Sequence, residues 1–219
     1  MRTDRQKVRR FATVGIAALA IAVSGAAAGS KTNSCTETAM IVFDASGSMG
    51  VEHRGRLKIE TARAAVTEVL PDITGIRQTG LVTYAGCSRV ELRVSPARNT
   101  DQIIIAALAA TPARGSTPLA HAVARAHATL AQSKESGVIV LVTDGLESCS
   151  GNPCRLAHRI AATTPEIRVH VIGFALTPDI ARSHLKCLTD VTGGTYAHAH
   201  DQRALSKALR ETLGCPMLS

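Results

Sequence analysis

The sequence predicts an α/β fold in which helices cover both faces of a mostly parallel central sheet. Short apolar segments alternate along the chain with longer segments whose apolar residues recur every three or four positions, as in amphipathic helices. Two of the short segments, 39–43 and 138–142, are continuous apolar runs, which are typical of buried strands in a parallel sheet. Right-handed crossovers then bring the carboxyl ends of the parallel strands to one edge of the sheet, where ligand sites collect.

The first half of the chain is predicted to hold three strands and two helices. After a strand at 38–43, apolar residues between Leu57 and Leu70 give a helix at 56–70 one buried stripe, and Pro71 is expected to end that helix. Residues 80–84 form the next strand, and the alternation of apolar and polar residues at 89–94 predicts an antiparallel edge strand. Capping side chains at 99–101 predict a helix that continues to Ala110.

The second half continues the alternation of helices and strands. Pro118 is expected in the first turn of a helix, because its missing N–H costs nothing there. A central strand at 138–142 follows, then a helix that begins at Asn152-Pro153 and a strand at 168–175. Thr177-Pro178 begins a helix that continues to residue 191, residues 195–197 begin a short last strand, and a helix at 201–213 ends before Gly214.

The first 28 residues resemble an export signal. A basic segment up to Arg10 precedes an apolar stretch, and the small residues Ala26-Ala27-Ala28 provide a cleavage site. The alternative is an uncleaved membrane anchor, but the apolar stretch is slightly shorter than the ~20 residues that a spanning helix needs. We therefore expect cleavage, no stable membrane span afterwards, and an exported product that is periplasmic or secreted. Arg9-Arg10 leaves the twin-arginine route open.

Composition and charge count against nucleic acid as a ligand. Aromatic residues make up 2% of the chain and Trp is absent, so there is little surface on which bases could stack. The formal net charge is +8, but residues 1–28 contribute five basic residues and one acid, and the remainder carries only +4. A net charge this small is typical of an ordinary solvated surface. We expect no nucleic-acid partner.

Three segments at strand ends or helix starts carry residues that indicate a metal site. Residues 44–48 have the form Asp-x-Ser-x-Ser and follow the first strand. Gly115-Ser116-Thr117-Pro118 begins a helix, and Thr143-Asp144-Gly145 ends the strand at 138–142. Each segment alone is explained by a helix cap or a turn. Together they place carboxylate and hydroxyl oxygens, the hard ligands that Mg²⁺ prefers, at one edge of the sheet.

These segments resemble the metal-ion-dependent adhesion site (MIDAS) of von Willebrand factor type A (VWA) domains, and no position of the motif is missing. The resemblance implies a doubly wound sheet with one antiparallel edge strand, in an exported bacterial member of the family. It divides the chain into a signal peptide at 1–28, a linker at 29–36, a VWA domain at 37–215 and a tail at 216–219.

The resemblance also implies a ligand set, in which the hydroxyls of Ser46, Ser48 and Thr117 bind Mg²⁺ and the carboxylates bind it directly or through water: Asp44 and Asp144. Two carboxylates cancel the charge of a divalent ion while neutral hydroxyls add none, so the ion keeps an open position. In the family, an Asp or Glu carboxylate of a partner protein commonly fills it. We expect an adhesion-type binding module rather than an enzyme, with Mn²⁺ or Ca²⁺ as alternatives to Mg²⁺.

Two other functions stay open. A metal-assisted hydrolase would activate water, but we expect no His or Lys beside the site as a base, and no phosphate loop of the form G-x-x-x-x-G-K-[ST] occurs. A constitutive structural subunit of an envelope assembly is the other alternative. A second metal site at His198 and His200, next to Asp201, is a weaker interpretation than a solvated strand edge.

An even number of cysteines in an exported chain indicates disulfides, and six are candidates: Cys35, Cys87, Cys149, Cys154, Cys187 and Cys215. Zinc is the poorer alternative, because four residues separate Cys149 from Cys154 and no matching second pair follows. We expect Cys35 to pair with Cys215 and to join the two ends of the domain. The other four would tie loops and helices near the metal site, in an order that stays open.

Overall fold

The computed structural model describes residues 38–133, 136–176 and 178–214. The expected signal peptide, the linker, the tail and the expected Cys35–Cys215 pair therefore lie outside the described residues. No helix within the described ranges is both long enough and apolar enough to cross a lipid bilayer.

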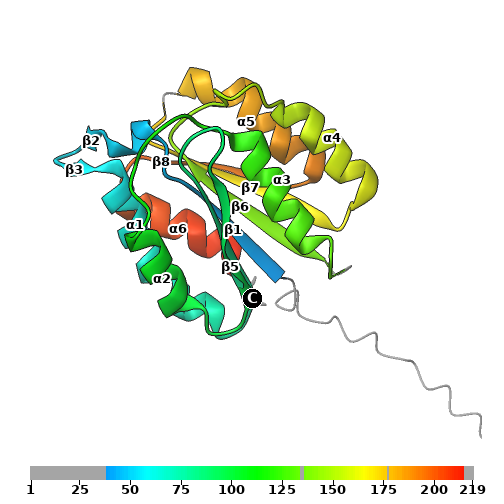
Figure 1. The fold of residues 1–219 in the computed structure, drawn as a ribbon, viewed down its shortest axis with the longest axis horizontal. Helices are drawn as coiled ribbons and strands as arrows, with labels where there is room; N and C mark the ends of the chain where they lie inside the picture. Colours follow the sequence, from blue (N-terminus) through cyan, green and yellow to red (C-terminus); the bar gives the residue numbers. More distant parts are fainter. Residues whose placement is uncertain (1–37, 134–135, 177, 215–219) are drawn as a thin grey trace, which may run out of the picture. The chain divides into compact units, whose positions relative to one another are not determined.

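A six-stranded sheet forms the centre of the fold, in the order β5-β4-β1-β6-β7-β8 (Figure 1). All neighbouring strands pair in parallel except β4 and β5, which pair antiparallel at one edge. The chain starts at the centre with β1, winds outward to β4 and β5, and then returns to build the other half, so the predicted doubly wound α/β sheet with one antiparallel edge strand is confirmed. The strand bounds are β1 Thr38–Asp44, β4 Thr79–Tyr84, β5 Val90–Ala97, β6 Gly137–Thr143, β7 Ile167–Phe174 and β8 Tyr196–Ala199.

Helices cover both faces of this sheet, as Figure 1 shows. One face packs against α1 (Lys58–Thr74), α2 (Asp101–Ala109) and α6 (Gln202–Leu213). The other face packs against α3 (Leu119–Leu130), α4 (Pro153–Thr163) and α5 (Pro178–Thr192). Successive β1 side chains alternate between the two cores: Ile41 and Phe43 enter the first, whereas Met40 and Val42 enter the second. Both faces of the central strand are therefore buried, which is why its sequence is continuously apolar.

Helix α1 continues through Pro71 to Thr74, so the prediction that Pro71 ends it was wrong. A proline inside a helix costs about 3 kcal/mol because it removes a hydrogen bond and crowds the preceding turn. Pro71 is exposed, whereas Ile73, two residues later, is only 3% exposed and packs in the core. Burial of such a side chain contributes about 1.5–3 kcal/mol, which offsets most of the cost of the proline.

A short hairpin that the sequence analysis did not predict precedes α1. Strands β2 (Glu52–His53) and β3 (Arg56–Leu57) pair antiparallel, and their two-residue turn has positive φ at Arg54 (53°) and Gly55 (79°). Such a turn matches the twist of a hairpin and requires a glycine or a strained residue. Helix α1 consequently begins at Lys58 rather than at the predicted residue 56.

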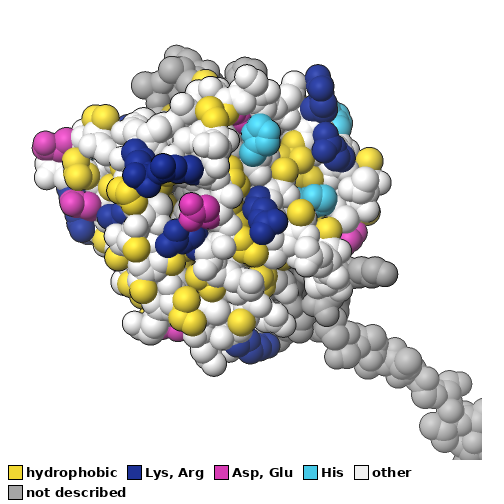
Figure 2. Space-filling view, viewed as in Figure 1, with side chains coloured by type: hydrophobic (Ala, Val, Ile, Leu, Met, Phe, Trp, Pro, Cys, Tyr) yellow, Lys and Arg dark blue, Asp and Glu magenta, His cyan; other side chains and the backbone are white. Residues whose placement is uncertain are grey.

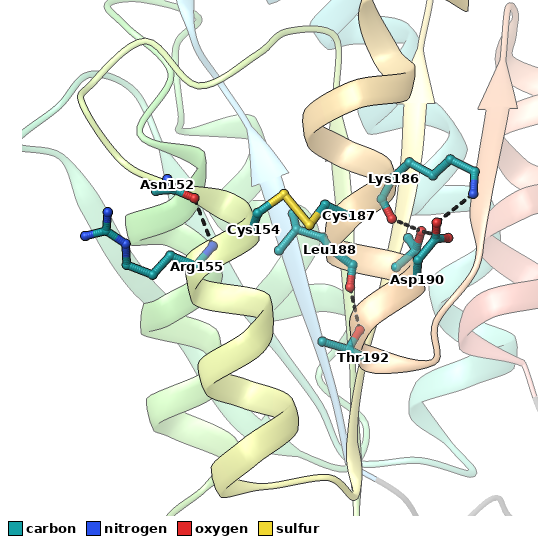
Figure 3. Close-up of a disulfide and its surroundings, with 9 residues drawn as sticks. Asn152, Cys154, Arg155, Lys186, Cys187, Leu188, Asp190 and Thr192 are labelled. Carbon is teal, nitrogen blue, oxygen red and sulfur yellow. Dashed lines mark hydrogen bonds and ion pairs between the residues drawn. A yellow bond between two sulfur atoms is a disulfide. The ribbon is translucent and has the colours of Figure 1, made fainter.

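Two disulfides lie within the described residues. Cys87 is bonded to Cys149, and Cys154 to Cys187. Cys154 lies in α4 and Cys187 in α5, so the second disulfide joins two neighbouring helices on the same face of the sheet (Figure 3). The open order of these four cysteines is thereby resolved, and no metal is needed to explain them.

Candidate metal centre

Asp44 ends the central strand β1, and its side chain is completely buried. Its Oδ1 accepts a hydrogen bond from the N–H of Ser46 at 2.7 Å, and its Oδ2 accepts one from the hydroxyl of Thr143 at 2.6 Å. Burial raises the pKa of the Asp44 carboxyl; hydrogen bonds from Ser46 and Thr143 oppose this, and the negative charge of Asp144 adds to it. A cation beside such a carboxyl would stabilise its ionised form.

Ser46 immediately precedes a short 3₁₀ turn, Gly47–Gly50, labelled η2, and Ser48 lies within it. Their Oγ atoms are 3.1 Å apart, and Ser48 Oγ donates to Asp144 Oδ1 at 2.7 Å. Adjacent ligands of an octahedral Mg²⁺ with bonds of 2.0–2.1 Å are about 2.9 Å apart. The spacing of these oxygens, and their chemistry, therefore fit a small hard cation.

Thr117 is buried just before α3, whose N-cap is Pro118; the proline lies one position earlier than predicted. A Cβ placed on Gly145 would be 3.6 Å from Thr117 Oγ1 and 3.7 Å from Ser48 Oγ, so the two hydroxyls approach the same side of Gly145. Within the described residues, Thr117 Oγ1 takes part in no hydrogen bond, unlike the two serine hydroxyls. Thr117 therefore adjoins the hydrogen-bonded group without being linked to it through its hydroxyl.

Backbone hydrogen bonds hold the Thr117 segment against the serine turn. The N–H of Gly47 donates to Gly115 O and that of Arg114 to Ala45 O, both at 2.8 Å. Gly115 has a φ of +74°, and a Cβ there would lie 2.9 Å from Gly86 Cα. Only glycine fits this close approach without displacement of the neighbouring backbone. Backbone hydrogen bonds thus join the first two motif segments.

The loop after β6 binds Thr117 from the other side. The N–H of Thr117 donates to Ser148 Oγ at 2.8 Å, and its carbonyl accepts from the N–H of Ser148 at 3.0 Å. Glu147 accepts hydrogen bonds from the N–H groups of Ala120 (2.7 Å) and Cys149 (2.8 Å). The backbone of Thr117 is therefore fixed by a loop that also carries one end of the Cys87–Cys149 disulfide.

Lys58 is the residue of the centre that the sequence analysis missed. Its Nζ is 2.8 Å from Asp144 Oδ2, with the lysine side chain 16% exposed and the aspartate side chain 0% exposed. We expected no His or Lys beside the site as a base; Lys58 does lie beside the site, but its Nζ is paired with Asp144. One signal was present: a basic residue in the first turn of a helix is unfavourable there, because that end of the helix dipole is positive.

Thr143 and Tyr84 support Asp44 from beneath. The Tyr84 hydroxyl donates to Thr143 Oγ1 at 3.2 Å, and Thr143 in turn donates to Asp44. Burial raises the pKa of Tyr84 well above its usual value, and the charge of Asp44 adds to this effect. The phenol therefore remains a hydrogen-bond donor, and the buried carboxylate keeps a fixed orientation.

The weaker histidine site finds no support in the described chain, where no group of three or more His, Cys, Asp or Glu could hold a metal ion. His198 and His200 are exposed, as a solvated strand edge requires. The candidate centre differs from such groups, because it combines two carboxylates with three hydroxyls.

Comparisons with known proteins agree with this architecture. A family model described as the von Willebrand factor type A domain matches residues 39–147. The uncharacterised protein YwmC of Bacillus subtilis is 28% identical over 181 residues, which cover 76% of this chain and 78% of YwmC. An aerotolerance-related membrane protein from Bacteroides fragilis superposes with a TM-score of 0.67 at 16% identity, covering 81% of this chain and 98% of that one. The pilus adhesin SpaC from Lactobacillus rhamnosus GG gives 0.65 at 17% identity, covering 81% of this chain but 30% of SpaC.

Proposed function

Since the chain belongs to the von Willebrand factor type A family, we propose that it is an exported protein-binding module with an intact MIDAS. Mg²⁺ would be held by the five residues of the motif, with Mn²⁺ or Ca²⁺ as alternatives: Asp44, Ser46, Ser48, Thr117 and Asp144. A bound ion would supply a Lewis-acidic position for an Asp or Glu carboxylate of a partner protein.

The observation that carries this proposal is the short contact between the first and third motif segments. Ser48 Oγ lies 2.7 Å from Asp144 Oδ1, although the two residues are 96 positions apart in the chain. Ser46 Oγ continues the row of oxygens at 3.1 Å. Because neighbouring ligands of Mg²⁺ have this spacing, the side chains would need little rearrangement to share an ion.

The surface beside the centre favours an acidic partner. A cleft of about 80 Å³ is lined by Arg89 and Arg114, which form no ion pair with the described residues, and by Arg93, which pairs with Glu91 at 2.7 Å. The N–H of Arg114 bonds to Ala45 O, so the cleft adjoins the serine turn. Figure 2 shows a group of Lys and Arg side chains where β5 and the loop before α3 lie in Figure 1. Such charge complementarity steers association and selects partners.

Binding accounts for the centre better than catalysis does. Lys58 lies beside the site, but its Nζ donates to Asp144 rather than remaining available to take a proton from a substrate or a water molecule. The exposed Ser48 marks the side from which a ligand can approach, whereas Asp44 and Ser46 are buried. The centre thus offers a place to hold a ligand, without a free general base.

Export is supported by the leader pattern at 1–28 and by the disulfides, which persist in oxidising compartments. SpaC, 30% of which superposes on this chain, is described as a pilus adhesin, and a role in surface recognition is proposed for this chain in the same sense. A constitutive envelope subunit is the alternative. It predicts a complex that survives chelation.

The test compares two threonine substitutions near opposite ends of the third helix. We expect the oxidised wild-type chain to bind one Mg²⁺ in isothermal titration calorimetry, and Thr117→Ala to weaken that binding by on the order of tenfold or more, about 1.4 kcal/mol per decade. Thr129→Ala is the matched control, because among the described residues its hydroxyl bonds only to Arg125 O in α3. Partner capture from extract should require Mg²⁺ and disappear in EDTA. Equal affinity of the wild type and Thr117→Ala would contradict the proposal.

A further inference from the structure

Lys58 forms an ion pair at the centre that the MIDAS motif does not include. It is the first residue of α1, and its Nζ lies 2.8 Å from Asp144 Oδ2. Only 16% of the lysine side chain is exposed, and the aspartate side chain is fully buried. An ion pair with so little water around it is screened much less than one on the surface.

The two oxygens of Asp144 have different partners. Oδ1 accepts from Ser48, on the side of the serine hydroxyls, whereas Oδ2 accepts from Lys58. Lys58 and Ser48 therefore bind different oxygens of the same carboxylate, and the lysine leaves the hydrogen bond between Ser48 and Oδ1 in place.

The charge of the centre changes when Lys58 is counted. In formal charges, Asp44 and Asp144 contribute −2 and Lys58 contributes +1, so these three groups sum to −1 rather than −2. A divalent ion would then bring the sum to +1 instead of zero. The positive end of the α1 dipole, where Lys58 lies, has the same sign as the lysine.

We propose that Lys58 is the affinity-setting residue of the centre: it weakens binding of the divalent cation and, once the cation is bound, strengthens capture of an anionic carboxylate. This inference rests on the proposed function, since it assumes that the centre takes Mg²⁺. The positive charge opposes an incoming cation at short range in a poorly screened site. The same charge attracts a carboxylate to the loaded centre.

The first measurement is the affinity for Mg²⁺ alone, by titration calorimetry of the oxidised chain. We expect Lys58→Met to bind Mg²⁺ on the order of tenfold more tightly than the wild type, because the opposing charge is gone. Lys58→Arg, which keeps the charge, should stay within about threefold of the wild type. Lys207→Met is the matched control: this lysine pairs with Glu211 at 3.8 Å and its side chain is 76% exposed.

The second measurement separates an electrostatic role from a structural one. Without metal, Lys58→Met should lower the melting temperature, because the buried Asp144 loses its counter-charge. In saturating Mg²⁺ the variant should gain more melting temperature than the wild type does. A purely structural lysine would lower the melting temperature equally in both conditions and leave the affinity unchanged, which would overturn the proposal.

The third measurement uses acetate as a carboxylate probe. Mn²⁺-loaded protein is titrated with acetate while the water-proton relaxation rate is followed, since acetate displaces water from the ion. We expect the wild type to respond at several-fold lower acetate concentration than Lys58→Met; an equal response overturns the carboxylate half of the proposal. If neither protein binds Mg²⁺ or Mn²⁺, the proposed function fails as well. If both bind with equal affinity, only the role of Lys58 fails.

Discussion

Cys87–Cys149 and Cys154–Cys187 are bonds of the same kind, but their surroundings in the fold differ. Cys87–Cys149 joins the loop after β4 to the loop after β6, at the edge where the candidate centre lies. Cys154–Cys187 joins α4 to α5 (Figure 3). The two bonds span 62 and 33 residues, and loop-closure entropy predicts about 4 kcal/mol of stabilisation for each. Their contributions to stability should therefore be similar, and any difference in function must come from their neighbours.

The neighbours of Cys87–Cys149 hold the segment that carries Thr117. On one side the N–H of Gly86 donates to Ser116 O at 3.0 Å, and on the other Ser148 bonds twice to the backbone of Thr117. The disulfide covalently joins these two loops, so residues 116–117 are hydrogen-bonded on both sides to crosslinked segments. Around Cys154–Cys187, the hydrogen bonds that Figure 3 shows are local to α4 and α5, such as Thr192 to Leu188. One crosslink thus lies beside the candidate centre, whereas the other joins two packed helices.

The largest expected effect comes from removing each disulfide in turn. We expect Cys87→Ser/Cys149→Ser and Cys154→Ser/Cys187→Ser each to lose about 4 kcal/mol of unfolding free energy, measured by urea denaturation in EDTA. Mg²⁺ affinity should fall on the order of tenfold only in the first variant, because only that disulfide fixes the loops around Thr117.

Each double variant serves as the control for the other, since both lose two cysteines and one crosslink. An equal loss of Mg²⁺ affinity in the two variants would show that global stability, rather than the crosslink between the loops around Thr117, determines the affinity. Both titrations should be made at a temperature where circular dichroism shows each variant to be folded.

A smaller effect is expected from the threonines that lie beneath each region. Thr143→Val removes the hydroxyl that donates to buried Asp44 and accepts from Tyr84, which should cost about 2–3 kcal/mol of stability because a charged acceptor loses its donor. Thr192→Val removes a hydroxyl that donates to Leu188 O and accepts from Val169 N–H, and should cost about 1 kcal/mol.

The same pair of variants tests whether the two regions are independent. Mg²⁺ affinity should decrease in Thr143→Val, because Asp44 loses its fixed orientation, and stay unchanged in Thr192→Val. The measurement is titration calorimetry alongside urea denaturation. Loss of affinity in Thr192→Val would contradict the separation of the two regions.

The parts that could be predicted from the sequence are those that depend on short-range patterns. The continuous apolar runs of β1 and β6 reflect burial on both faces, and the MIDAS-like segments each occupy a few consecutive residues. Their convergence at one edge followed from the parallel arrangement of the strands. The sheet and the approach of Ser48 to Asp144 could therefore be predicted from patterns within these short segments.

The parts that could not be predicted are contacts between distant residues that neither the motif nor the order of the strands indicates. Lys58 meets Asp144 across 86 positions, and Thr143 meets Asp44 across 99. No local pattern encodes such pairs, and the pairing of four cysteines has the same character. The prediction that Pro71 ends its helix failed for a related reason: burial of Ile73 in the tertiary core outweighed the local rule for ending helices.

The smallest expected effect is a pH dependence of the unfolding free energy that comes from His170, a residue away from the candidate centre. His170 lies on β7, opposite Val140 rather than at the strand ends, and its Nδ1 accepts the N–H of Thr195 at 3.1 Å. Burial, together with the positive charges of Arg168 and Arg77, lowers the pKa of His170 to about 4. Between about pH 6.5 and 4 the unfolded chain therefore binds a proton that the native chain does not. Stability falls as the pH falls through this range, by about 1–2 kcal/mol because the ring is partly exposed.

His170→Asn checks this sign, because the amide oxygen of Asn can accept the same N–H but does not titrate. Urea midpoints measured in EDTA from pH 8 to 4 should decline less steeply in the variant than in the wild type, with a constant difference above about pH 7. Burial also lowers the pKa of His127, so part of the acid sensitivity will remain in the variant. Identical slopes for both proteins would mean that His170 is protonated equally in the native and unfolded chains. Because His170 lies away from the candidate centre, adding Mg²⁺ should raise every midpoint at pH 7 to 8 without changing the difference between the two proteins.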